Sequence, residues 1–185
     1  MERPNPETTG IIVVDIQERL APVMPEASLA QVVRSVRILS AASRLLGAPL
    51  FVTEQYPKGL GPTIPAVAEA VAAASPQQFE KIEFSAADCD EVRAALKSAA
   101  VTDVVVVGME THVCVFQTVR DLVNIGLDVY VPIDGVCSRR EDHREAGLAL
   151  CEEAGAIRTT TESLVFDWLR KATGDKFKEL SKLIR

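Results

Sequence analysis

Histidine is scarce in this sequence, which restricts the metal sites that the chain can form. His112 and His143 are the only two, and neither an H-x-x-x-H nor an H-E-x-x-H spacing occurs. The four cysteines show no C-x-x-C pair and no spacing typical of a zinc finger. We therefore expect a protein that binds no metal ion and no other cofactor, with its cysteines as free thiols.

Long apolar runs and an excess of positive charge are also missing. No apolar run reaches the ~18–20 residues of a membrane span, and the N-terminus is polar without the apolar core of a signal peptide. The 20 basic residues are outnumbered by 26 acidic ones, a formal charge of −6 that disfavours contact with nucleic-acid phosphates. We expect a cytoplasmic protein that binds neither membranes nor nucleic acid.

Several nucleotide and hydrolase motifs are absent as well. The sequence has no G-x-G-x-x-G dinucleotide motif, no G-x-x-x-x-G-K-[ST] phosphate loop and no G-x-S-x-G hydrolase elbow. These absences exclude the best-marked dinucleotide, nucleoside-triphosphate and serine-hydrolase sites.

The most informative stretch that is present runs from Val104 to Val115. Four consecutive valines end at Gly108, a short polar turn follows, and Cys114 stands just inside an expected helix. Proteins with alternating strands and helices place reactive groups where a buried strand turns into a helix. The helix dipole and free N–H groups there are expected to lower the pKa of Cys114, which makes this thiol a candidate nucleophile.

Apolar periodicity along the rest of the chain predicts six strands that alternate with helices. This alternation implies right-handed crossovers and a mainly parallel sheet. We predict one Rossmann-like, doubly wound α/β domain over residues 1–185, with a tail at about 1–8, helices on both faces and strand order 3-2-1-4-5-6. Ser28 is the expected N-cap of the first long helix. The predicted strands are 10–15, 49–53, 78–81, 103–107, 127–132 and 156–160.

Polar residues fall at the carboxyl ends of these strands, where ligands bind in such sheets. Asp15 ends the first strand, Lys81 the third, Cys114 follows the fourth and Asp134 the fifth. If the first and fourth strands are neighbours, Asp15 and Cys114 face each other and Lys81 approaches from the side. Each residue alone has an ordinary structural explanation as a cap, a surface lysine or a core thiol. Their convergence on one edge supports a site for attack on a carbonyl carbon, with Asp15 as the base.

Three segments resemble the motifs of the isochorismatase-like (cysteine hydrolase) superfamily. They are Val13–Gln17, Phe79–Ser85 and Gly108–Val115, and the similarity spans nearly the whole chain. Thr53–Pro57, Ser138–Arg139 and Phe177–Glu179 are most similar to the isochorismatase domain-containing subgroup.

The resemblance implies specific roles for residues of the site. It implies an Asp15–Lys81–Cys114 triad, a cis peptide bond between Met109 and Glu110, and an oxyanion hole formed by the backbone N–H groups of Glu110 and Cys114. By the same analogy, Gln17, Gln55 and Thr111 are expected to contact the substrate.

Two features of the sequence restrict the expected chemistry. Nicotinamidase-type members carry an Asp-x-His metal site after the second strand, whereas this chain has Thr53-Glu54-Gln55 and hence no histidine there. Members that cleave the vinyl ether of isochorismate do not need a thiol, so Cys114 favours hydrolysis of an amide, ureido or imide C–N bond.

The leading hypothesis is therefore a metal-independent cysteine hydrolase that acts on a small molecule through a thioester-type intermediate. The alternatives are a vinyl-ether hydrolase of the isochorismatase type and, from another class, a non-catalytic scaffold that retains the fold. A redox-sensing thiol is a weaker alternative. Because Phe166, Trp168 and their apolar neighbours exceed what one small core needs, we also expect a homo-oligomer, a dimer or larger.

Overall fold

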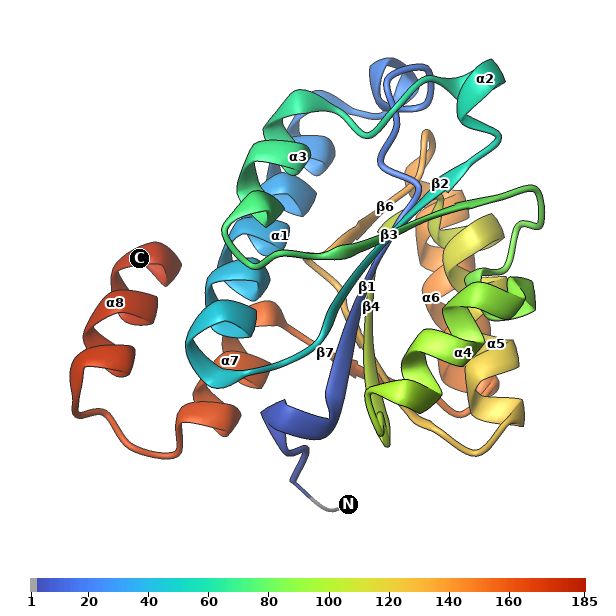
Figure 1. Cartoon of the computed structure of the whole chain (residues 1–185). Coiled ribbons are helices and arrows are strands. Elements are labelled where there is room, and N and C mark those ends of the chain that lie inside the picture. Colours follow the sequence, from blue (N-terminus) through green and yellow to red (C-terminus); the bar gives the residue numbers. More distant parts are fainter. Residues whose placement is uncertain (1–2) are drawn as a thin grey trace.

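The computed structural model describes residues 3–185 and shows a seven-stranded parallel sheet between two layers of helices (Figure 1). The order along the main path is β3-β2-β1-β4-β5-β7, and β6 pairs with β4. The predicted doubly wound fold and the order of its six strands are confirmed. The predicted number of strands is wrong by one, because the two-residue strand β6 carries no periodic pattern. The strands are β1 (Thr9–Val14), β2 (Leu50–Gln55), β3 (Gln77–Lys81), β4 (Asp103–Met109), β5 (Asp128–Pro132), β6 (Val136–Cys137) and β7 (Ile157–Thr159).

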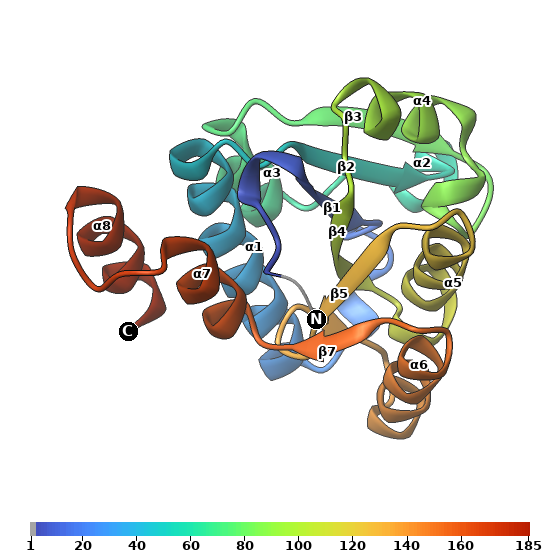
Figure 2. The ribbon, with the colours of Figure 1, turned by 90° about the horizontal axis from the view of Figure 1, so that it is seen from below.

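Helices cover both faces of the sheet, as Figures 1 and 2 show from two directions. Helices α1, α3, α7 and α8 lie on one side, and α4, α5 and α6 lie on the other. Their bounds are α1 Glu26–Leu46, α2 Pro57–Leu60, α3 Pro65–Ala72, α4 Asp90–Ser98, α5 Phe116–Asn124, α6 Glu141–Glu153, α7 Thr161–Leu169 and α8 Asp175–Ile184. Four short helical turns are η1 (Pro6–Thr8), η2 (Ala21–Val23), η3 (Ala86–Asp88) and the π-helix η4 (Thr111–Val115).

The central strands β1 and β4 divide their side chains between two apolar cores. In β1, Ile11 and Val13 pack against the α1 side, whereas Ile12 and Val14 pack against the α5 side. All six residues of β1 are buried, which explains the continuous apolar run in the sequence. Because helices cover both faces of the sheet, the polar residues that follow β1 and β4 lie at its carboxyl edge.

Three local predictions need correction. Helix α1 starts at Glu26 after Pro25, so Ser28 lies inside the first turn and is not the N-cap. Trp168 is buried in the chain's own core, and the Phe166 ring packs on Phe177 with centroids 6.2 Å apart. The apolar residues that motivated an oligomer are thus used within the chain. Of the predicted tail 1–8, residues 1 and 2 lie outside the described residues, and residues 6–8 form η1.

No helix within residues 3–185 is long and apolar enough to cross a membrane.

Candidate active site

Asp15 and Lys81 form a buried ion pair at the carboxyl edge of the sheet. The Lys81 Nζ–Asp15 Oδ2 distance is 2.6 Å, and both side chains are fully buried. Asp15 directly follows β1 and Lys81 is the last residue of β3, two strands away. Thr53, at the level of Val14 on the intervening strand β2, donates to Asp15 Oδ1 at 2.7 Å. This contact of Thr53 was not predicted, although Thr53 ends the predicted strand 49–53, which pairs with β1.

The ammonium group of Lys81 has all three of its hydrogens engaged. Besides Asp15, it donates to the carbonyl oxygens of Glu83 at 2.9 Å and Phe84 at 3.1 Å. An ammonium carries three donors and no acceptor. Lys81 is therefore held as a fixed positive charge beside Asp15.

Cys114 completes the cluster from the π-helix η4, where its buried thiol lies near enough to Asp15 that each side chain shifts the pKa of the other. Burial raises the pKa of this thiol to about 12, and the negative charge of Asp15 adds to the rise, with Lys81 opposing it. The expectation that the helix terminus lowers the pKa of Cys114 is therefore wrong for this site. Loss of hydration and the adjacent carboxylate outweigh the helix dipole, so the thiol keeps its proton.

Burial also raises the pKa of Asp15, which makes its carboxylate a better base. Removal from water raises the pKa of Asp15 above its ordinary value of 3.8, while Lys81 lowers it in opposition. A carboxylate with a raised pKa accepts a proton more readily than an exposed one does. The geometry thus places a protonated thiol against a carboxylate that can receive its proton.

The backbone between β4 and α5 brings Cys114 to this position. The Met109–Glu110 peptide bond is cis, and the carbonyl oxygen of Glu110 accepts from Val113 N at 3.0 Å and Val115 N at 3.3 Å. The second of these bonds spans five residues, the π-helical pattern, which often occurs at functional sites. This turn carries the two N–H groups predicted to bind an oxyanion, those of Glu110 and Cys114.

The predicted substrate contacts differ in what their geometry allows. Gln17 is fully buried, and its amide donates to Gln55 O at 2.9 Å and Gly61 O at 2.7 Å and accepts from Gln55 N at 2.8 Å. This side chain holds the 55–61 loop and has no free N–H for a ligand, so the geometry opposes its predicted role. Gln55 is partly exposed and donates to Ile82 O at 3.2 Å. The side chain of Thr111 is buried, so a contact with substrate stays a prediction.

Asp134 is not part of the cluster, although it follows a neighbouring strand. Its carboxylate accepts from Thr161 N at 2.8 Å and from Ser35 Oγ at 3.3 Å, and it thereby joins α7 to α1. The position of Asp134 after a strand predicted that it lies at the carboxyl edge, but it did not determine where its side chain points.

The carboxyl end of β2 does not offer a suitable metal site. Thr53 is bound to Asp15, and Glu54 Oε1 accepts from the backbone N and the hydroxyl of Thr63 at 2.6 and 2.7 Å. Within residues 3–185, no group of three or more His, Cys, Asp or Glu side chains is arranged to hold a metal ion.

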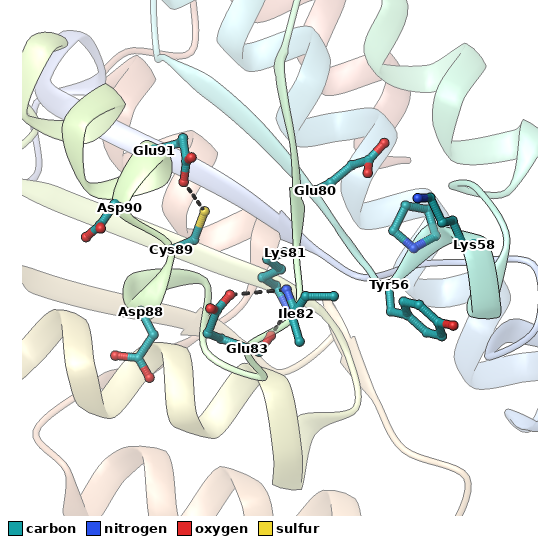
Figure 3. Close-up of a pocket in the computed structure, with 11 residues that line it drawn as sticks. Tyr56, Lys58, Glu80, Lys81, Ile82, Glu83, Asp88, Cys89, Asp90 and Glu91 are labelled. Carbon is teal, nitrogen blue, oxygen red and sulfur yellow. Dashed lines mark hydrogen bonds between the residues drawn. The ribbon is translucent and has the colours of Figure 1, made fainter.

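A cavity of about 400 Å³ adjoins the ion pair on the Lys81 side (Figure 3). Figure 3 shows Lys81 between Cys89 of the segment before α4 and Tyr56 of the segment after β2. Cys114 and Asp15 do not line this cavity, so it meets the cluster through Lys81. Its lining residues are Tyr56, Pro57, Lys58, Glu80, Lys81, Ile82, Glu83, Asp88, Cys89, Asp90 and Glu91.

Comparison with known proteins identifies the family. The model of the isochorismatase domain matches residues 9–163 of this chain. The chain belongs to the isochorismatase family. Isochorismatase domain-containing protein 2A of Mus musculus is 34% identical over 181 residues, which cover 97% of this chain and 84% of that protein.

Two solved structures show how far the similarity extends. The structure titled MAR1 ribonuclease from Caenorhabditis elegans is 39% identical, with a TM-score of 0.90 over 99% of this chain and 92% of that one. YcaC of Escherichia coli, titled an octameric hydrolase of unknown specificity, shares the fold at 20% identity, with a TM-score of 0.88 over 98% and 89% of the two chains.

Proposed function

We propose that this isochorismatase-family protein is a metal-independent cysteine hydrolase that cleaves a C–N bond of a small molecule. The observation that carries the proposal is the buried Lys81–Asp15 ion pair with the buried Cys114 thiol beside the same carboxylate. A base, a nucleophile and a fixed cation in one buried cluster are the groups that acyl transfer needs.

The first half of the reaction forms a covalent intermediate. Asp15 takes the thiol proton as Cys114 Sγ forms a bond to the carbonyl carbon, and the carbonyl oxygen becomes an oxyanion. The N–H groups of Glu110 and Cys114 stabilise the oxyanion by hydrogen bonding. The positive charge of Lys81 stays beside Asp15 and stabilises its carboxylate form. When the C–N bond breaks, Asp15 returns its proton to the departing nitrogen, which leaves an amine and a thioester.

The second half restores the enzyme. Asp15, again a carboxylate, takes a proton from water as the water oxygen attacks the thioester carbon. Collapse of the tetrahedral species breaks the C–S bond, and the proton on Asp15 passes to the sulfur of Cys114. The products are a carboxylic acid and an amine, and the thiol and the carboxylate are regenerated.

The charges around the cavity beside Lys81 favour a neutral or cationic substrate. Five of its lining residues are acidic and two are basic, and one of the basic pair, Lys81, is neutralised by Asp15. This field opposes a dicarboxylate such as isochorismate and therefore disfavours the vinyl-ether alternative. It opposes RNA phosphates in the same way, although one solved relative has a ribonuclease name.

Activity on a panel of small amides, ureido compounds and imides tests the proposal, with isochorismate and RNA as further substrates. We expect release of an amine or ammonia by the wild type, no release by Cys114→Ala, and an acyl adduct on Cys114 when the reaction is quenched with acid. Cys151→Ala, which removes a buried thiol from α6, is the matched control and should keep its activity.

Two outcomes oppose the proposal. Full activity of Cys114→Ala on a confirmed substrate excludes Cys114 as the nucleophile. No turnover across the panel, together with a Cys114 no more reactive than free cysteine, favours the scaffold.

We further propose that the protein self-associates; YcaC of Escherichia coli, which shares the fold, is described as octameric. Large apolar side chains stay exposed near the cavity, namely Tyr56, Ile82 and Phe84. Light scattering on the purified chain tests this proposal, and a monomer at micromolar concentration overturns it.

A further inference from the structure

The residues after β6 hold the turn that carries Cys114. Ser138 is buried, and its Oγ accepts a hydrogen bond from Thr111 N at 3.1 Å. The next residue, Arg139, donates its backbone N–H to Glu110 Oε2 at 2.9 Å. Ser138 thus binds the backbone of Thr111 through its side chain, and Arg139 binds the side chain of Glu110 through its backbone.

These contacts fix the peptide plane between Glu110 and Thr111 from both sides. Its carbonyl oxygen accepts from Val113 N and Val115 N, and its N–H donates to Ser138. A planar amide bound at both ends cannot rotate without breaking at least one of these bonds. The plane lies directly after the cis peptide bond at Met109–Glu110 and three residues before Cys114.

The His112 ring lies within hydrogen-bond distance of the Ser138 hydroxyl. His112 Nδ1 lies 3.1 Å from Ser138 Oγ, and burial lowers the pKa of His112, so the ring is neutral at pH 7. A neutral ring with its proton on Nε2 accepts the serine hydrogen, and the serine oxygen is then free to accept from Thr111. The His143 ring lies against His112, with centroids 4.6 Å apart.

Helix α6 packs closely against the same turn at Gly147. A Cβ on Gly147 would stand 2.6 Å from His112 N and 2.7 Å from Thr111 C, which is too close for any side chain. The backbone of residues 111 and 112 is therefore held between α6 and the residues after β6. Such close packing leaves Thr111 N little freedom other than to point at Ser138.

We propose that Ser138 is a positioning residue for the oxyanion-binding turn, and that His112 sets the direction of its hydroxyl. Ser138 does not touch the reacting atoms. It holds the Glu110–Thr111 peptide plane, so that the N–H groups of Glu110 and Cys114 keep a fixed direction toward the carbonyl oxygen of a substrate. This inference rests on the proposed function.

Two thiol reagents with different charge development test the inference without a known substrate. Addition of Cys114 to acrylamide places negative charge on the carbonyl oxygen, whereas displacement on iodoacetamide places it on the departing iodide. Positioned oxyanion donors accelerate only the first reaction. The quantity to measure is the ratio of the acrylamide rate to the iodoacetamide rate at Cys114, by mass spectrometry of its peptide.

The variants are Ser138→Ala, Ser138→Cys and Ser138→Thr. Ser138→Cys keeps the shape of the side chain with a slightly larger atom and is a much weaker acceptor, so it keeps the test valid if Ser138→Ala does not fold. We expect both to lower the ratio by about 10-fold, a part of the ~100–1000-fold effect of losing an oxyanion donor. Ser138→Thr keeps the hydroxyl and should restore the ratio. Ser40→Ala, which removes a buried hydroxyl that donates to Ala70 O on the opposite face of the sheet, should leave it unchanged.

The possible failures are distinguishable. An unchanged ratio in folded Ser138→Ala or Ser138→Cys overturns the inference and leaves the proposed function intact. Equal losses with both reagents show a purely structural role and also overturn it. If wild-type Cys114 adds acrylamide no faster than free cysteine does, the inference and the proposed function fail together.

Discussion

Gly108 lies so close to Val14 that no other residue fits between β4 and β1. A Cβ on Gly108 would stand 2.1 Å from the carbonyl oxygen of Val14, and Gly108 has a φ of +127°, a conformation that other residues rarely adopt. The two residues are partners in the register of the central strand pair. Asp15 follows Val14 and the Cys114 turn follows Gly108, so this contact sets how closely base and nucleophile approach.

Gly108→Ala should therefore destabilise the fold far more than an ordinary glycine substitution. The clash is with backbone atoms of a central strand, which cannot move aside as a flexible side chain can. We expect urea unfolding to show a loss of about 3 kcal/mol or more. Gly126→Ala is the matched control, because Gly126 also has a positive φ (+90°) but no neighbour within 4 Å of a built Cβ. Its cost should be that of the left-handed conformation alone, about 1–2 kcal/mol. Equal losses in the two variants would contradict this account.

The buried ion pair predicts a strong coupling between Lys81 and Asp15. Lys81→Met leaves a fully buried carboxylate without its cation, a change that typically costs ~3–5 kcal/mol. Adding Asp15→Asn removes the stranded charge, so the double variant should unfold at a higher urea concentration than Lys81→Met alone. A double-mutant cycle measures this coupling. Lys178→Met, at an exposed pair with Asp175, is the control and should change little. Strictly additive losses at Asp15 and Lys81 would show that the charges do not interact.

Much of the fold and of the site was predictable because it depends on local patterns. The buried runs at 10–14 and 104–107 mark central strands, and a doubly wound sheet places their carboxyl ends side by side. Asp15, Lys81 and Cys114 could thus be grouped from strand ends alone. The structure pairs Asp15 with Lys81 and places the Cys114 thiol beside them.

Other features depend on contacts that a sequence does not display. Strand β6 is two residues long, too short for any periodicity, and the Ser138 contact depends on it. The direction of the pKa shift at Cys114 depends on how deeply the thiol is buried, which its position at a helix terminus does not reveal. The role of Gln17 depends on which backbone groups lie beside its amide, and those come from the loop at 55–61.

The pKa shifts predict how activity depends on pH. Attack requires the carboxylate of Asp15 and the proton of Cys114, so kcat/KM should rise with pH as Asp15 ionises. Because burial raises the pKa of Asp15, the midpoint should lie above 3.8. With the pKa of Cys114 at about 12, no second transition from the thiol should occur below about pH 10. A rate that rises with a midpoint near 9 would instead indicate a free thiolate with an ordinary pKa.

The same shift on Asp15 has a consequence for stability. Because its pKa is higher in the folded than in the unfolded chain, the folded state binds more protons between the two values. The contribution of Asp15 to the free energy of unfolding therefore falls as pH rises from the unfolded pKa through the folded one. Urea titrations across that range should show this slope in the wild type and a smaller slope in Asp15→Asn. An identical slope in both proteins would assign it to other groups.

Gln17 should prove essential for the 55–61 loop rather than for direct substrate contact. Gln17→Met keeps the length of the side chain but removes its bonds to Gln55 N, Gln55 O and Gly61 O, leaving these backbone groups without that partner. At about 1 kcal/mol for each bond, we expect a loss of ~2–3 kcal/mol in urea and faster proteolysis within the loop. Gln55→Met, which removes one bond from a partly exposed amide, is the control and should cost less. If Gln17 instead bound substrate directly, Gln17→Met would raise KM while unfolding and proteolysis stayed as in the wild type.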